Sequence, residues 1–218
     1  MDMTFRDRTE AGQELARRLM RYTHRPDVLV LGLPRGGVPV ADVVARALHA
    51  PLDTIVVRKL GVPGQEELAL GAIASGGSRV LNEAVVQELG IPEQVVEAIT
   101  SREQQELARR ERLYRGDRPG FKVRGRTIIL VDDGLATGAT MRAAIAALRQ
   151  QSPTRIVVAV PVAPSVVCQR LRVVADEVVC LLTPEHFFGV GRWYQDFSPV
   201  TDDEVRGLLE GAAQIPAT

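Results

Sequence analysis

Apolar and polar positions along most of the chain follow a strand-then-helix order. Uninterrupted aliphatic runs, typical of strands buried on both faces of a parallel sheet, are separated by stretches with the spacing of amphipathic helices. We expect strands at 28–32, 54–57, 126–131, 155–160 and 177–182. We expect helices at 8–22, 38–49, 141–149 and 165–174, and a last helix that opens on a capping box at 201–204. This order predicts an α/β fold, a doubly wound and mostly parallel sheet that binds ligands at the carboxyl ends of its strands.

Residues 61–122 interrupt this alternation. They begin with the turn residues 61–64, continue with a hairpin signal at Gly76-Gly77, and then form one long charged helix at 92–114. A chain of 218 residues is most simply one domain, 1–218, which carries this segment as an insertion. Arginines and glutamates alternate along the long helix, so we expect a solvated helix face and no nucleic-acid contact.

The most informative segment runs from 128 to 140. Four aliphatic residues are followed by Asp132 and Asp133, then by a loop of small and hydroxylated residues, then by a helix. The first-turn amides of such a helix and its macrodipole favour an anion, and small residues let a phosphate approach the backbone closely. Carboxylates repel phosphate but suit sugar hydroxyls or a divalent cation. The segment therefore predicts a site for a phosphorylated sugar.

Other interpretations of this segment fit less well. A Walker loop would require Gly-Lys-Ser/Thr, and a dinucleotide fingerprint would require Gly-x-Gly-x-x-Gly; neither is present. The remaining alternative is an ordinary strand, turn and helix with a solvated acidic corner. Two adjacent carboxylates at the end of a buried strand repel each other unless a ligand uses them, which favours the functional interpretation.

Two further loops place cations at strand ends. Arg35-Gly36-Gly37 follows the first predicted strand, and Arg58-Lys59 follows the second. A forked guanidinium and exposed glycine amides suit phosphate oxygens, although a glycine turn with a surface arginine is the simpler alternative for the first loop. We expect these cations to face Asp132 and Asp133 across one cleft.

The segment 128–140 resembles the phosphoribosyl-pyrophosphate (PRPP) signature of the type I phosphoribosyltransferases: an aliphatic run, two acids, three residues and then Thr-Gly-x-Thr. The resemblance implies a PRPP-dependent and Mg²⁺-dependent transferase in which Asp132 and Asp133 bind the ribose hydroxyls and the metal. It implies that the 5′-phosphate binds to five residues of the turn: Ala136, Thr137, Gly138, Ala139 and Thr140.

The two cationic loops are similar to parts of the same family. Residues 34–37 resemble its pyrophosphate loop, and residues 58–64 resemble the Arg-Lys-x-Gly-x-x-Pro-Gly segment of adenine phosphoribosyltransferases. Pyrophosphate with Mg²⁺ is then expected between Arg35-Gly36-Gly37 and Arg58-Lys59. The resemblance assigns catalysis to four side chains: Asp132, Asp133, Arg35 and Lys59.

Two segments are expected to cover the site. In the family a mobile loop lies where this chain has 61–122, so the insertion is expected to be a flap or a dimerisation element, with Glu66 or Glu67 as candidate proton donors. The segment 183–200 resembles the C-terminal hood of hypoxanthine-guanine phosphoribosyltransferases. By that resemblance Phe187 or Phe188 stacks on a base and Asp196 joins the metal site, whereas core packing is the alternative.

The acceptor is not determined by the sequence. The purine enzymes that read a 6-oxo group carry a lysine soon after the fourth core strand, and 160–164 has none. A nucleobase is the expected acceptor. The alternatives to a transferase are a PRPP-sensing or nucleotide-sensing regulator with little turnover, and a hydrolase of phosphorylated sugars.

The composition of the chain limits which partners and which cellular location we expect. The chain has 27 basic and 27 acidic residues, so no overall field favours nucleic acid or an anionic membrane. No signal peptide or membrane span is expected, and we expect a cytoplasmic protein, for which the resemblance suggests a homodimer. Cys168 and Cys180 lie in apolar surroundings and are expected to be core thiols.

Overall fold

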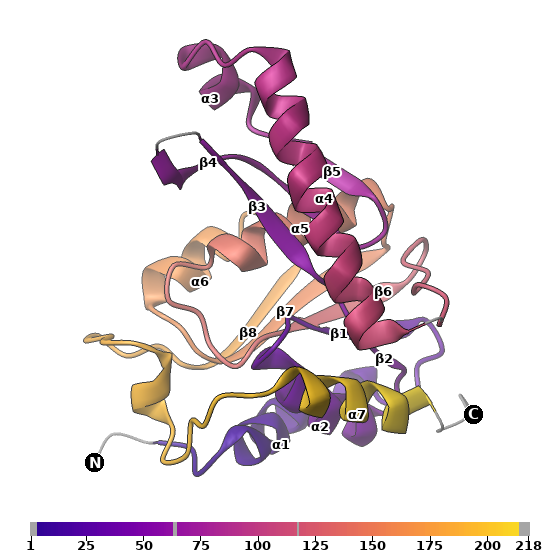
Figure 1. Cartoon of the computed structure of the whole chain (residues 1–218). Coiled ribbons are helices and arrows are strands. Elements are labelled where there is room, and N and C mark those ends of the chain that lie inside the picture. The colour runs from indigo at the N-terminus through magenta and orange to yellow at the C-terminus, as the bar shows by residue number, and fades with distance from the viewer. Residues whose placement is uncertain (1–3, 63–64, 117, 214–218) are drawn as a thin grey trace.

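The computed structural model describes residues 4–62, 65–116 and 118–213. Five parallel strands form the main sheet in the order β2-β1-β6-β7-β8 (Figure 1). Their bounds are β1 Val28–Gly32, β2 Leu52–Thr54, β6 Thr127–Val131, β7 Arg155–Val162 and β8 Glu177–Leu182. The expected α/β fold with a mostly parallel sheet is confirmed.

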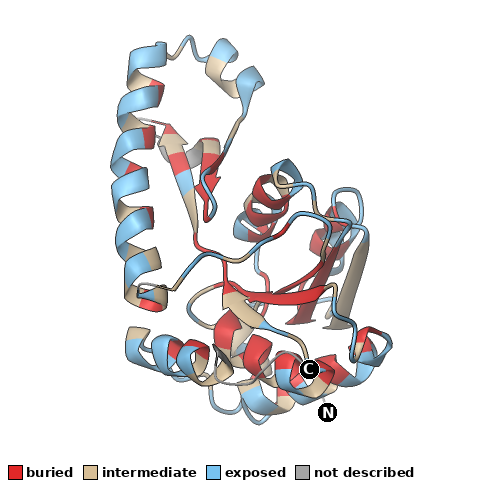
Figure 2. Ribbon diagram, turned by 90° about the vertical axis from the view of Figure 1, so that its right-hand side faces the viewer, coloured by how far each residue is buried: buried red, intermediate tan, exposed pale blue. Residues whose placement is uncertain are grey.

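Helices cover both faces of this sheet. On one face, α1 (Arg8–Leu19), which continues into the short 3₁₀ helix η1 (Met20–Tyr22), and α2 (Gly37–Leu48) pack against alternate strand residues such as Val30 and Ile129. On the other face, α5 (Ala139–Gln150) and α6 (Ser165–Leu171) pack against the residues between them. The central strands are therefore buried along their length, as Figure 2 shows, because parallel strands need apolar side chains on both faces.

The predicted insertion 61–122, together with residues 57–60 before it, forms a second, antiparallel sheet. Its strands are β3 Val57–Val62, β4 Gln65–Ala74 and β5 Ser78–Leu81. The short α3 (Glu83–Glu88) and the long α4 (Glu93–Arg115) follow, and this unit rises above the main sheet (Figure 1). The predicted hairpin is confirmed: Gly76 and Gly77 join β4 to β5 with φ of 86° and 78°.

One predicted strand is wrong. The run 54–57 is not a strand, because the chain leaves the main sheet after Thr54 and enters the small sheet at Val57. The Thr54 hydroxyl donates to the carbonyl of Gly32 at 2.8 Å, which fixes the end of β2. The Val56 N–H then donates to Ser75 Oγ at 3.0 Å and its carbonyl accepts from Ser75 N, which aligns the start of β3 with the end of β4.

The C-terminal part of the chain returns to the insertion. After the 3₁₀ helix η2 (Val190–Trp193), α7 (Asp202–Ala213) begins at the expected capping box, in which Thr201 and Glu204 each bond to the other's backbone N–H. The hydroxyl of Tyr114 at the end of α4 donates to Asp202 at 2.7 Å.

The helix predicted at 165–174 corresponds to α6, which ends three residues earlier than expected, at Leu171.

Cys168 is buried in the core and Cys180 is half-buried beside it, both as free thiols, as expected. None of the helices in the described parts of the chain combines the length and the apolarity that a membrane crossing requires.

Candidate active site

The acid pair lies at the carboxyl end of β6, in the middle of the main sheet. Asp132 Oδ1 accepts the backbone N–H of Asp133 at 2.9 Å, which fixes the first carboxylate against its own turn. Burial, and then the adjacent charge of Asp133, raise the pKa of Asp132 well above its ordinary value. Burial also raises the pKa of Asp133, against an opposing effect of Arg8. Raised pKa values in a polar turn are typical of functional sites.

Arg8 is a residue of the site that sequence reasoning missed. Its Nε and Nη2 each lie 2.9 Å from Oδ2 of Asp133. Its guanidinium also lies 4.1 Å from the ring centroid of Phe197 and donates to the carbonyl of Ser198 at 2.9 Å. No local signal could have found this pair, because 125 positions separate the two residues.

The C-terminal segment holds the same acid from another side. The hydroxyl of Tyr194 donates to the backbone carbonyl of Asp133 at 2.6 Å, and the Tyr194 ring is buried beside Phe5. Asp133 is therefore fixed through its side chain by α1 and through its backbone by the hood segment.

The loop after β1 lies directly against the acids. A Cβ added at Gly36 would be 1.9 Å from Oδ2 of Asp133, and one added at Gly37 would be 2.7 Å from the carbonyl of Val131. Only glycine allows this approach. The peptide bond between Pro34 and Arg35 is cis, and the Arg35 side chain is exposed. The structure thus brings together the first cationic loop and the acid pair, as predicted.

The turn after the acids is open to solvent. Gly138 precedes α5 with a φ of 70°, while the side chains of Thr137 and Thr140 are exposed. The N–H of Ala139 donates to Thr137 Oγ1 at 3.3 Å. Within the described chain, the N–H groups of Thr140 and Met141 have no acceptor. The start of α5 therefore presents backbone donors, the feature that favours a bound anion.

The structure separates Arg58 from Lys59, against the prediction that both bind pyrophosphate. Neighbouring residues of a strand point to opposite faces. Arg58 points to α4, where Nη2 lies 2.6 Å from the buried carboxylate of Glu103. Lys59 lies on the other face, toward α5. Arg58 is thus a structural partner of the insertion, and Lys59 alone remains a candidate for the site.

The predicted role of Asp196 in a three-acid metal site is not supported. Its carboxylate is exposed and accepts the N–H of Ser198 at 2.9 Å and the hydroxyl of the same residue at 2.6 Å. Throughout the described ranges, no group of three or more His, Cys, Asp or Glu side chains lies close enough together to hold a metal.

The two hood aromatics differ in exposure. Phe188 is 81% exposed, with its ring 6.5 Å from that of His186, whereas Phe187 is half-buried.

The side chains of Glu66 and Glu67, the candidate proton donors, lie outside the described residues.

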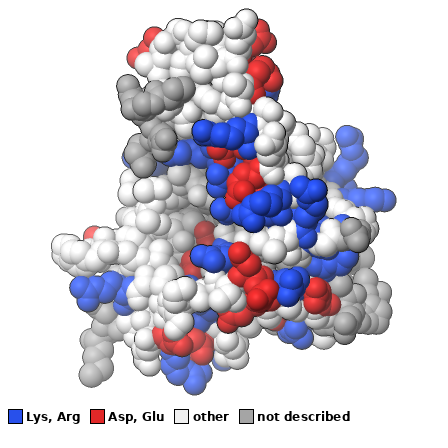
Figure 3. Space-filling view, viewed as in Figure 1, with Lys and Arg blue, Asp and Glu red and all other residues white. Residues whose placement is uncertain are grey.

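Along α4, Glu106 pairs with both Arg109 and Arg110. Figure 3 shows acidic side chains among the basic ones on this face.

The family model and the two most similar curated relatives that we report indicate the same family. A family model described as a phosphoribosyl transferase domain matches residues 6–195. Two Mycobacterium tuberculosis proteins, from strains CDC 1551 and H37Rv, each provisionally named a phosphoribosyl transferase, are 48% identical over 208 residues, which is 95% of this chain. The chain spans only 47% of the length of these relatives. The crystal structure of TT1426 from Thermus thermophilus is 46% identical, with a TM-score of 0.86 over 95% of this chain and 98% of that one.

Proposed function

The chain belongs to the phosphoribosyl transferase domain family, and on that premise we propose that it transfers the phosphoribosyl group of PRPP to a nitrogenous acceptor, with release of pyrophosphate. The observation that carries this proposal is the contact between two loops: the acid pair after β6 lies against Gly36 of the loop after β1, beside an open turn with unpaired amides. A substrate that carries a diol, a phosphate and a pyrophosphate needs these three features together.

The sugar phosphate would bind along the loop after β6. The 2′- and 3′-hydroxyls donate to Asp132 and Asp133, and the 5′-phosphate accepts from the turn 136–140. The Thr137 and Thr140 hydroxyls are exposed and can donate as well. The sugar is then held both at its diol and at its phosphate, which fixes the position of the reacting carbon, C1.

The pyrophosphate would lie over the loop 35–37, with Lys59 as the second cation. The donor set fits Mg²⁺, since this metal prefers carboxylate, phosphate and water oxygens and needs few protein ligands. Bound there with the substrate, it would neutralise the charge that develops on the departing pyrophosphate. The transition state at ribose C1 resembles an oxocarbenium ion, so the acid pair stabilises charge and no covalent nucleophile is needed.

The acceptor would approach from the hood. Phe188 offers an exposed aromatic face on which a flat base can stack, and Phe187 is the second candidate. A nucleobase nitrogen is the proposed nucleophile. Water must be kept out, because its attack would hydrolyse the activated sugar.

One assay distinguishes the transferase from its alternatives. The protein is incubated with PRPP, Mg²⁺ and a pool of nucleobases, and pyrophosphate release is followed. Release that depends on a base supports the transferase; release without a base indicates a hydrolase; binding of PRPP without release indicates a regulator. The matched control is the double variant Asp132→Asn with Asp133→Asn, which should lose roughly 3–6 kcal/mol of PRPP binding if the two contributions add.

A further inference from the structure

The two cysteines of the chain lie side by side on neighbouring elements. Cys168 is on α6, and Cys180 is on β8 with its side chain on the face of the sheet that α6 covers. The two thiols are in hydrogen-bond contact with each other, and the Cys180 thiol also donates to the carbonyl of Leu182 at 3.2 Å. Because the sequence has no third cysteine, each thiol has one possible partner for an intramolecular disulfide.

One thiol of the pair reaches the surface. Cys180 is half-buried and lines a hollow of about 370 Å³ along the last strand of the main sheet, with Arg18, Arg21 and Arg172. Contact with the Cys180 thiol lowers the pKa of Cys168 to about 7, against the effect of burial, and Arg172 lowers it further. The same contact raises the pKa of Cys180, so the pair loses one proton well before the other. Since the thiolate is the form of cysteine that reacts with oxidants, the pair is reactive near neutral pH.

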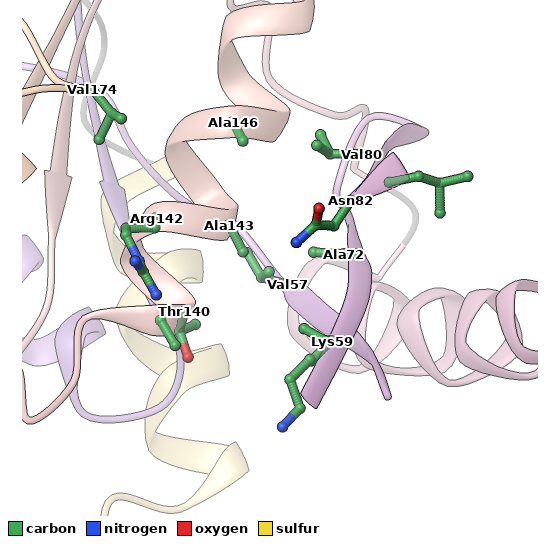
Figure 4. A pocket seen from close by; sticks show the side chains of 14 residues that line it. Val57, Lys59, Ala72, Val80, Asn82, Thr140, Arg142, Ala143, Ala146 and Val174 are labelled. Carbon is green, nitrogen blue, oxygen red and sulfur yellow. The ribbon is translucent and has the colours of Figure 1, made fainter. Parts of the chain in front are cut away.

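The segment that carries Cys168 contacts the turn before α5 at two places. A Cβ added at Gly138 would be 2.7 Å from Cγ1 of Val167, so the residue next to Cys168 packs directly on the turn. After α6 ends, Val174 lines a cavity of about 560 Å³ together with Thr140 at the start of α5 (Figure 4). A displacement of α6 would therefore change the surroundings of the turn.

We propose that Cys168 and Cys180 form a reversible disulfide with hydrogen peroxide as the oxidant, and that this bond loosens the turn before α5. The thiolate of the pair attacks one oxygen of the peroxide, the O–O bond breaks, and a sulfenic acid and water result. The second sulfur then attacks the sulfenic sulfur: the S–S bond forms, the S–OH bond breaks, and a second water leaves. Two thiols lose two hydrogens and two electrons, and one peroxide is reduced to two waters.

The bond would move α6. A disulfide brings two sulfurs to about 2 Å, well inside the distance of a nonbonded contact, so one of the two elements must shift. Strand β8 is paired with β7 from Glu177 to Leu182, whereas α6 has seven residues and joins the core through side chains. Since β7 lies between β6 and β8, a shift of α6 toward β8 draws Val167 away from the turn that follows β6. Without this packing the turn should move more and bind an anion less tightly.

The test treats the reduced full chain with hydrogen peroxide and follows its thiols by mass spectrometry and on a non-reducing gel. We expect a monomer that has lost two hydrogens and both free thiols, and dithiothreitol should reverse the change. Hydrogen exchange of the amides at 137–141 should be faster in the oxidised protein. Its affinity for ribose 5-phosphate should fall at least about fivefold. This last measurement rests on the proposed function, whereas the others do not.

Cys180→Ser is the matched control, because it keeps Cys168 and the four methionines of the chain. Peroxide should leave the hydrogen exchange and the ribose 5-phosphate affinity of this variant unchanged, which separates the disulfide from methionine oxidation. Cys168→Ala should behave in the same way. An equal response of either variant to peroxide would overturn the proposal.

Three results with the parent chain would also overturn it: intermolecular dimers in place of the internal bond, a sulfinic acid in place of a disulfide, or a disulfide that leaves exchange at 137–141 unchanged. Unchanged affinity of an oxidised chain that binds ribose 5-phosphate when reduced would do the same. If the reduced chain does not bind ribose 5-phosphate, the proposed function fails, and the thiol and exchange measurements still decide whether the disulfide loosens the turn.

Discussion

The guanidinium of Arg8 contacts the carboxylate of Asp133 through two nitrogens, Nε and Nη2, each 2.9 Å from the same Oδ2. The pair is largely buried, with 12% and 13% of the two side chains exposed. Arg8 is thus the positive charge in contact with an acid that the proposed reaction needs in its ionised form. The pair joins α1 to the loop after β6, so the N-terminal helix positions a residue of the site.

Replacing Arg8 should move the pH dependence of ligand binding. Arg8 lowers the pKa of Asp133 while burial raises it, so Arg8→Gln leaves the carboxyl protonated up to a higher pH. Because the ribose hydroxyls donate to an ionised acid, affinity for ribose 5-phosphate should fall about tenfold at neutral pH and recover as the pH rises. Calorimetry across pH measures this; Arg8→Lys should recover part of the loss. If Arg8→Gln lowers the melting temperature but leaves the pH profile of ribose 5-phosphate affinity unchanged, Arg8 contributes to packing and does not tune Asp133.

A methyl group at Gly36 should disable the site without unfolding the domain. The added Cβ would lie 1.9 Å from Oδ2 of Asp133, so Gly36→Ala must displace the acid or the loop. We expect ribose 5-phosphate binding to fall below detection. Gly207→Ala on α7, where a Cβ meets nothing within 4 Å, is the matched control and should keep full affinity. Normal affinity of Gly36→Ala would contradict the contact between the two loops.

Asp132→Asn should stabilise the fold while it removes ligand binding. The pKa of Asp132 is raised in the folded state. The protonated acid therefore stabilises the fold fully below about pH 4, which is the pKa of an aspartic acid in the unfolded chain. That stabilisation is lost as the pH rises through the folded pKa. The amide keeps Oδ1 as the acceptor for Asp133 N and carries no charge. We expect Tm at pH 7 to rise by about 2–4 °C, or about 1 kcal/mol, and no gain at pH 3. A lower Tm at pH 7 would contradict this.

Arg58 and Lys59 should have different roles although they are neighbours. Arg58→Met leaves Glu103 buried, with the more distant Arg102 as its remaining ion-pair partner among the described residues, so urea unfolding should show a loss of about 1–3 kcal/mol. Lys59→Met should leave stability within about 0.5 kcal/mol and weaken PRPP more than ribose 5-phosphate, because only PRPP carries pyrophosphate. Equal effects of the two substitutions on PRPP would restore the original prediction that both cations bind it.

Tyr114 should make the fold sensitive to alkali. Burial, and then the hydrogen bond to Asp202, raise the pKa of Tyr114 to about 12. The neutral phenol therefore stabilises the fold fully below about pH 10, which is the pKa of a tyrosine in the unfolded chain. This contribution is lost as the pH rises from 10 to 12. Tyr114→Phe should cost about 1 kcal/mol at pH 8 and should weaken the pH dependence above 10. Urea unfolding of both proteins at several pH values measures this. Parallel curves would show that Tyr114 does not contribute.

The hydrophobic pattern predicted most of the fold. Fully apolar runs such as 128–131 are typical of strands that are buried on both faces of a parallel sheet, and this pattern correctly placed β1, β6, β7 and β8. The turn glycines Gly76 and Gly77 predicted the hairpin for an equally local reason. The run 54–57 was wrong because its apolar residues are buried where the chain passes from one sheet to another, which periodicity cannot distinguish from a strand.

By itself, the sequence determined the strand-then-helix order, the acid pair at the end of a buried strand and the turn of small and hydroxylated residues after it, because these depend on neighbouring residues. Only the tertiary structure decided what faces the acids. It brought Arg8 and Gly36 to Asp133, turned Arg58 away to Glu103, and left a cavity beside α5. Such contacts join residues tens of positions apart or depend on which face of a strand a side chain occupies, and no local pattern of residues encodes them.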